Sequence, residues 1–155
     1  FRQYNIPIKI IRPFHTYGPG MKIGDGRAFV DFAFNIINSE NIDIRSDGTA
    51  IRSYCYLKDA ALAYFYILFE GENGQAYNVG NPYEQYSIKE LAQILIDLFP
   101  RKKLSITLNP EYNDKNYKPS SINRSVPNIE KIRKLGWEPK TDVKSGFFRT
   151  INSYQ

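Results

Sequence analysis

The order of apolar and polar positions along the chain predicts short strands that alternate with helices. A nearly continuous apolar run at 6–11 (Ile-Pro-Ile-Lys-Ile-Ile) predicts a strand covered on both faces, as in a parallel sheet. Further strands are expected at 43–45, 52–57, 76–80 and 104–108. This alternation favours an α/β fold.

Helices are expected where apolar residues recur every three or four positions. The first covers 29–37, and the second covers 60–69 with Asp59 as its N-cap. The clearest helix covers 87–99 and begins with the Ser-Ile-Lys-Glu spacing of a capping box. Each has one apolar face, which indicates packing against a sheet or another helix.

Two more helices are expected near the C-terminus. One begins after Asn128 and closes at Gly136, a residue type that commonly ends helices. The other begins after Asp142. Its inward-facing residues are expected to be Phe147, Phe148 and Ile151. The connecting loops are long, and long loops in a compact chain are usually functional.

The composition is that of one folded domain, because 42% of the 155 residues are hydrophobic and 15% are aromatic. No apolar run approaches the roughly 18 residues that a membrane helix needs, and no signal segment opens the chain. We therefore expect a cytoplasmic protein with no membrane partner. Cys55 has no second cysteine to pair with, which agrees with a reducing compartment, and one histidine with one cysteine leaves no His/Cys metal site.

A net charge of +5 and a pI near 9.2 suit either nucleic acid or a small ligand that carries phosphate. One hypothesis is therefore a small basic nucleic-acid-binding module, with Tyr and Phe as stacking platforms. Such a module needs aromatic residues interleaved with clustered Lys and Arg. Here most aromatic residues lie on apolar helix faces, and the one basic cluster is 101–103. We therefore expect no nucleic-acid partner.

Two apparent catalytic motifs do not have the right context. Gly18, Gly20 and Gly24 have the spacing G-x-G-x-x-x-G, with a proline inside it and no helix starting at the glycines, so they do not form a dinucleotide-binding turn. Tyr54 and Lys58 have the spacing of a Tyr-x-x-x-Lys pair, which works on a helix. The expected strand at 52–57 would instead place them about 13 Å apart.

Five short motifs resemble those of the extended short-chain dehydrogenases that act on nucleotide sugars, the NAD-dependent epimerase/dehydratase family with its decarboxylase branch. The first, R-P-F-H-T-Y-G-P at 12–19, is similar to the family signature R-x-x-N-x-Y-G-P. The others follow in the family's order over nearly the whole chain. They are G-D-G-R at 24–27, D-G-T-A-I-R-S-Y-C-Y-L-K-D at 47–59, Y-N-V-G at 77–80 and L-G-W-E-P at 135–139.

The resemblance implies an α/β fold in which residues 1–155 are the substrate-binding half of an extended Rossmann-type short-chain dehydrogenase, a fragment of a longer protein. The N-terminal cofactor sheet is then largely missing, with 1–12 and 76–80 as its last strands. NAD and the catalytic Tyr-x-x-x-Lys pair belong to the missing half. It follows that this chain alone has no catalytic residue, binds no NAD and is inactive, whereas the parent enzyme is an NAD-dependent homodimer.

The resemblance also names candidate site residues for a nucleotide-sugar substrate. Arg52 lies where the family places an arginine that binds the diphosphate, and an arginine offers a bidentate fork suited to phosphate. Lys118 aligns with a second family arginine but lacks that fork. Arg124 lies in the same loop and contacts phosphate or braces the loop.

Three further candidates come from the first two motifs. His15 replaces the asparagine that hydrogen-bonds the diphosphate in the family, and its ring can donate one hydrogen bond when neutral or pair with phosphate when protonated. Arg27 reaches toward the base or ribose. The motif of Tyr17 lines the floor of the family's site near the nicotinamide, so Tyr17 is the candidate cofactor contact; the alternative is that it only packs in the core.

Overall fold

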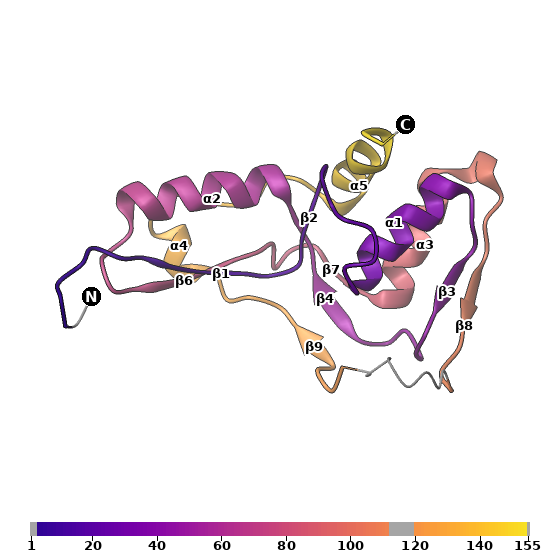
Figure 1. The fold of residues 1–155 in the computed structure, drawn as a ribbon, viewed down its shortest axis with the longest axis horizontal. Coiled ribbons are helices and arrows are strands. Elements are labelled where there is room, and N and C mark those ends of the chain that lie inside the picture. Colours follow the sequence, from indigo (N-terminus) through magenta and orange to yellow (C-terminus); the bar gives the residue numbers. More distant parts are fainter. Residues whose placement is uncertain (1–2, 112–119, 155) are drawn as a thin grey trace.

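The computed structural model describes residues 3–111 and 120–154, and it is organised around two hydrophobic clusters at opposite ends of its long axis (Figure 1). The smaller cluster contains a parallel pair of strands packed against two helices. These elements are β1 (Ile10–Pro13), β6 (Ala76–Val79), α2 (Leu57–Glu70) and α4 (Glu130–Arg133). Trp137 is buried among them and donates its indole N–H to the Asp59 carbonyl at 3.0 Å.

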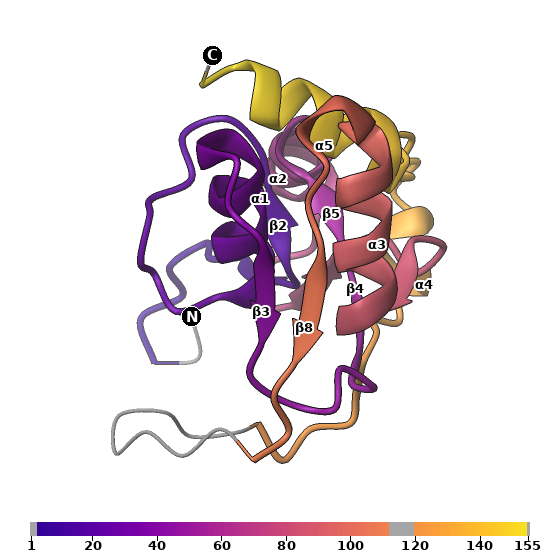
Figure 2. The same ribbon diagram turned by 90° about the vertical axis from the view of Figure 1, so that its right-hand side faces the viewer.

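The larger cluster is formed by helices that pack beside a second parallel pair of strands (Figure 2). The helices are α1 (Ala28–Asn38), α3 (Ile88–Leu98) and α5 (Val143–Asn152), and the strands are β3 (Ile42–Ile44) and β8 (Ile106–Leu108). A short 3₁₀ turn, η1 (Pro100–Lys102), follows α3. Its Lys102 donates to the carbonyl of Ile37 in the last turn of α1, which helps to satisfy the end of that helix.

Short strands connect the two clusters in the middle of the molecule (Figure 1). One parallel pair is β2 (Thr16–Tyr17) with β5 (Cys55–Tyr56). The other group is three-stranded, in the order β7 (Gln85–Ser87), β4 (Ile51–Ser53), β9 (Arg124–Ser125). β4 is antiparallel to β7 and parallel to β9. The predicted α/β class is confirmed, with small, mainly parallel sheets.

The caps of α3 and α5 follow the sequence prediction. Ser87 accepts the backbone N–H of Glu90, and the Glu90 carboxylate accepts that of Ser87, which completes the capping box. Asp142 caps α5 by accepting the backbone N–H of Ser145 at 2.8 Å. These contacts are local, and local spacing is enough to predict them.

Other predicted boundaries are wrong. The strand expected at 6–11 begins at Ile10, because its partner β6 has only four residues, and Ile6 and Ile8 remain exposed. α2 begins at Leu57 rather than after Asp59, so Asp59 lies in the first turn and is not the N-cap. The helix expected from Asn128 is only Glu130–Arg133.

One expected inward residue is also wrong. Phe147 and Ile151, four residues apart on α5, are both fully buried, but Phe148 is 47% exposed. Phe148 points about 100° away from Phe147 around the helix and stacks on Phe99 instead, with ring centres 5.7 Å apart. None of the helices in the described ranges is both long and apolar enough to cross a membrane.

Candidate functional site

A pocket of about 460 Å³ lies where four segments meet. Its lining consists of residues 13–16 between β1 and β2, Arg27 at the start of α1, Tyr64 of α2 and Ser125 of β9. These segments are far apart in the sequence, so only the folded chain forms the pocket. Two of the six predicted site residues, His15 and Arg27, line it.

The backbone around His15 is fixed from both sides. The N–H of Phe14 donates to the carbonyl of Val79 in β6 at 2.8 Å, and the N–H of Cys55 in β5 donates to the carbonyl of His15 at 2.9 Å. The segment is therefore held by two separate sheets, and the His15 side chain is presented to the pocket from a rigid base.

The imidazole of His15 packs against two aromatic rings. The rings of Phe29 and Tyr54 each lie 6.0 Å from it, centre to centre. Its Nδ1 is buried and has no hydrogen-bond partner in the described part of the chain. Burial, followed by the nearby charges of Arg52 and Arg27, lowers the pKa of His15 below 6.5.

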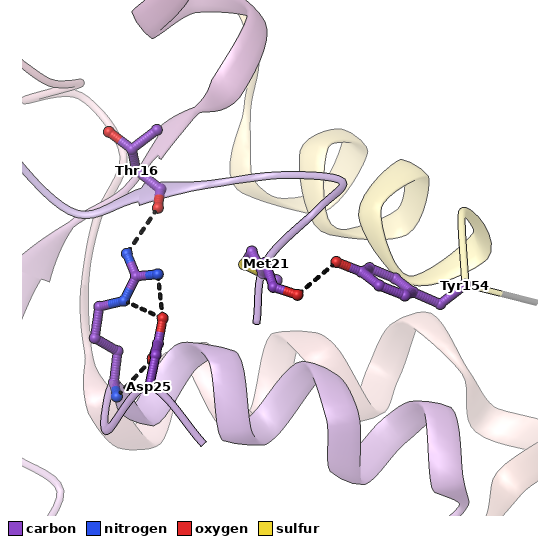
Figure 3. Close-up of polar contacts among 5 residues, drawn as sticks. Thr16, Met21, Asp25 and Tyr154 are labelled. Atoms are coloured by element: carbon purple, nitrogen blue, oxygen red, sulfur yellow. Dashed lines mark hydrogen bonds and ion pairs between the residues drawn. The ribbon is translucent and has the colours of Figure 1, made fainter. Parts of the chain in front are cut away.

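Arg27 is held in place by three contacts at the edge of the pocket, and Figure 3 draws those to Asp25 and Thr16. Its guanidinium forms an ion pair with Asp25 and donates to the carbonyl of Thr16 at 3.3 Å. It also lies 4.8 Å from the centre of the Phe29 ring, within the range of a cation–π contact. The hydrogen bond from Arg27 lowers the pKa of Asp25, so this carboxylate stays charged at neutral pH.

Arg52 is nearly buried, with 9% of its surface exposed. It donates to the carbonyl of Ile51 at 2.8 Å and to the hydroxyl of Ser120 at 3.3 Å. Within residues 3–111 and 120–154, no carboxylate forms an ion pair with it. A buried cation without a counter-ion is costly, so this guanidinium is suited to receive an anionic group.

The remaining predicted residues are placed differently. Arg124, one residue before Ser125, is exposed and donates to the side chain of Gln85 at 2.6 Å. Lys118 lies outside the described residues. Tyr17 is buried in the larger cluster, stacked on Phe147 with ring centres 3.9 Å apart, and its hydroxyl donates to the carbonyl of Asp142. A cofactor contact by Tyr17 stays a prediction.

The sequence analysis missed three residues of this region. Asp25 lies in the G-D-G-R motif two positions before Arg27, and that spacing of opposite charges in a glycine-rich turn is a usable signal. Tyr54 was considered only as a partner of Lys58, but it is buried whereas Lys58 is exposed. Tyr64 gives no signal in the sequence, because it follows the same apolar pattern as the rest of α2.

The glycine-rich loop does not fit the pyrophosphate of NAD. The loop 18–27 separates β2 from α1, whereas a dinucleotide-binding turn is tight and leads directly into its helix. The first free N–H of α1, that of Arg27, is already bonded to the Asp25 carboxylate at 3.0 Å. In the described ranges, no group of three or more His, Cys, Asp and Glu side chains is arranged to hold a metal ion.

The protein is therefore an α/β protein with a pocket lined by aromatic rings and flanked by arginines. Such a site is suited to a phosphorylated ligand. Residues 1–80 match the family described as the NAD dependent epimerase/dehydratase family. The chain belongs to this family.

Curated relatives agree with this assignment. UDP-glucuronic acid decarboxylase 5 of Arabidopsis thaliana is 34% identical over 147 residues, which cover 94% of this chain and 40% of that protein. A trifunctional UDP-glucose 4,6-dehydratase, 3,5-epimerase and reductase from the same plant is 29% identical over 156 residues, covering 99% of this chain and 22% of its own length. The chain therefore spans about 40% of the decarboxylase it matches.

Solved structures share the fold over almost the whole chain. UDP-glucose 4-epimerase of Thermotoga maritima, solved with UDP-glucose, has a TM-score of 0.84 and 22% identity, covering 99% of this chain and 47% of the epimerase. UDP-glucuronic acid 4-epimerase of Bacillus cereus, solved with UDP-glucuronic acid and NAD, has a TM-score of 0.81 and 22% identity, covering 97% and 46% of the two chains. At these identities the likeness shows the fold, which is Rossmann-type.

Proposed function

We propose that this chain is the substrate-binding half of an NAD-dependent nucleotide-sugar epimerase, dehydratase or decarboxylase. Its pocket holds the nucleotide diphosphate, and a cofactor-binding half supplies NAD and the catalytic tyrosine and lysine. The residues of this chain bind and orient the substrate, and the chemistry depends on the other half. The family, and the substrates after which its relatives and structural neighbours are named, support this proposal.

The observation that carries the proposal is the environment of Arg52. Arg52 is 9% exposed, no described carboxylate neutralises it, and its charge acts on His15, which lines the pocket. Arg27 adds a second cation from another element. The charges of Arg52 on β4 and Arg27 at the start of α1 both act on His15, and two guanidinium groups match the two charges of a diphosphate.

A surface suited to the cofactor half lies on α2 and β1. One face of α2 packs on the smaller cluster, while its other side exposes large apolar residues. These are Leu57, Leu62, Tyr64, Phe65, Tyr66, Leu68 and Phe69, each at least 38% exposed. Among the strands that the structure describes, β1 pairs on one edge only, with β6. An apolar helix face beside an unpaired strand edge is what a continuing sheet and its helices would cover.

The exposed aromatic residues of α2 also bear on the nucleic-acid alternative. Phe65 and Phe69 stack on each other with ring centres 6.4 Å apart, but no Lys or Arg lies between residues 59 and 70. Stacking platforms for nucleic acid are accompanied by cations along the same groove. The stretch 59–70 of α2 has none, so we retain the nucleotide-sugar proposal.

Calorimetric titration of the chain with UDP-glucose tests the proposal. The Arg52→Ala variant should weaken binding by about 1.5–3 kcal/mol, the range for hydrogen bonds to charged groups. Arg52→Lys should recover only part of this loss, because the fork geometry is absent. Arg101→Ala, which removes an exposed arginine of η1, is the matched control and should leave binding unchanged.

Two outcomes would contradict the proposal. One is equal affinity for UDP-glucose in the parent chain and both Arg52 variants, which would mean that Arg52 is no phosphate ligand. The other is tight binding of a single-stranded oligonucleotide at physiological salt together with no binding of UDP-glucose, which would support the nucleic-acid module.

A further inference from the structure

His15, the only histidine of the chain, is held in the wall of the pocket with one nitrogen unsatisfied. Its carbonyl is bonded to the N–H of Cys55, and its ring is fixed between Phe29 and Tyr54. Nδ1 is buried and finds no hydrogen-bond partner in the described protein. The imidazole ring is therefore held in one place, and no described hydrogen-bond acceptor fixes a proton on its Nδ1.

The charged groups that act on His15 are cationic. Beyond the effect of burial, the positive charge of Arg52, on β4, lowers the pKa of His15. The charge of Arg27, at the N-cap of α1 and in an ion pair with Asp25, does the same. The phenol of Tyr54, whose ring packs against His15, stays neutral because burial raises its pKa. Across the pocket, α2 and β9 present only uncharged side chains, those of Tyr64 and Ser125. His15 is therefore neutral in the free protein at neutral pH.

A bound phosphate reverses this balance. Negative charge beside Arg27 offsets the two guanidinium groups and favours an imidazolium at His15. We propose that His15 takes up one proton from solvent when a phosphate group binds in this pocket, so that nucleotide diphosphates bind more tightly as the pH falls. The step forms one N–H bond on the imidazole and breaks no bond in the ligand. It rests on the proposed function and adds a pH-dependent control to that site.

The direction of the effect follows from linkage. The pKa of His15 is low in the free protein and higher in the complex, so protonated complex is favoured between the two values. Affinity is lowest above both values and rises as the pH falls through them. Each unit by which binding raises the pKa strengthens binding about tenfold at low pH.

Nuclear magnetic resonance of the imidazole is the first test, because the single histidine gives one set of ring signals. In the free chain the titration midpoint should lie below 6.5. Arg27→Gln should raise this midpoint, since it removes a cation, whereas Lys22→Gln, an exposed lysine of the same loop, should not. Saturating UDP-glucose should raise the midpoint by about one unit. A midpoint unmoved by the bound ligand overturns the inference.

The second test measures affinity against pH. UDP-glucose is the probe because each of its two phosphates has one ester and one anhydride bond and so keeps a single charge across this range. Affinity of the parent chain should rise several-fold from about pH 8 to about pH 5.5. His15→Asn and His15→Gln keep a hydrogen-bond donor that does not titrate, so their affinity should be independent of pH.

The outcomes separate this inference from the proposed function. If UDP-glucose binds but its affinity does not depend on pH, the proton uptake is overturned and the proposed function stands. The same holds if the pH dependence is unchanged in both His15 variants. No binding at any pH overturns both. Calorimetry in two buffers of different ionisation enthalpy checks the count. A midpoint raised by about one unit corresponds to about half a proton taken up per ligand midway between the two midpoints, and to much less at pH 8.

Discussion

The carboxylate of Asp59 accepts the backbone N–H of Thr141 at 2.8 Å, although 82 residues separate them. The same oxygen accepts the N–H of Lys140 at 3.0 Å, and Asp59 is 4% exposed. One buried side chain of α2 therefore holds the loop that leads into α5. This contact joins the smaller cluster to a helix of the larger one.

Removing this carboxylate should destabilise the chain. Asp59→Ala leaves two backbone N–H groups without their charged acceptor, so the free energy of unfolding should fall by about 1.5–3 kcal/mol. Urea titration followed by circular dichroism measures the loss. Asp97→Ala, on the exposed face of α3, is the control and should change the value by less than about 0.5 kcal/mol. Equal effects in the two variants would refute this role of Asp59.

The single cysteine should be inert in the folded chain. Burial raises the pKa of the Cys55 thiol to about 12, from 9.0, and its side chain is fully covered. The reactive thiolate is then about a thousandfold rarer than in the unfolded chain near pH 8. Labelling with a thiol reagent, with and without urea, measures this difference. Comparable labelling rates in both conditions would show that Cys55 is accessible in the fold.

Local chemistry could be predicted from the sequence, and long-range contacts could not. Ser87 and Glu90 are three residues apart, so their capping box is visible in the sequence. Asp59 precedes an apolar helical stretch in the same way, and it was wrongly predicted as a cap. Its actual acceptor role depends on backbone groups more than 80 residues away, and no local pattern reports those.

The candidate site shows the same division. The resemblance identified Arg52, His15 and Arg27, because each lies inside one of the family-like motifs. Tyr64 reaches the pocket only because α2 crosses the strands at that position, and Ser125 only because β9 pairs with β4 in a register that places it beside Arg52. Such placement depends on how elements pack, which periodicity along one element does not encode.

The chain alone should bind no NAD. Its glycine-rich loop lacks the tight strand-to-helix turn, and the first N–H of α1 is occupied by Asp25. Denaturing the purified chain and assaying the extract for NAD should give none, and UDP-glucose should not be converted in the presence of added NAD. Stoichiometric NAD in that extract would contradict this expectation and the assignment of the cofactor to another half.

The exposed face of α2 should make the isolated chain self-associate. Phe65 and Phe69 are 58% and 73% exposed, and the β1 edge beside this helix is unpaired among the described strands. Contiguous apolar surface and open strand edges both favour association. Sedimentation should therefore show a mass that rises with protein concentration. The double variant Phe65→Glu and Phe69→Lys should reduce this association, because charges on that face disfavour its burial. Phe148→Ser, which removes a comparably exposed ring from α5, is the control and should still associate. If the parent chain stays monomeric at every concentration, the exposed apolar face of α2 does not need to be buried against another chain.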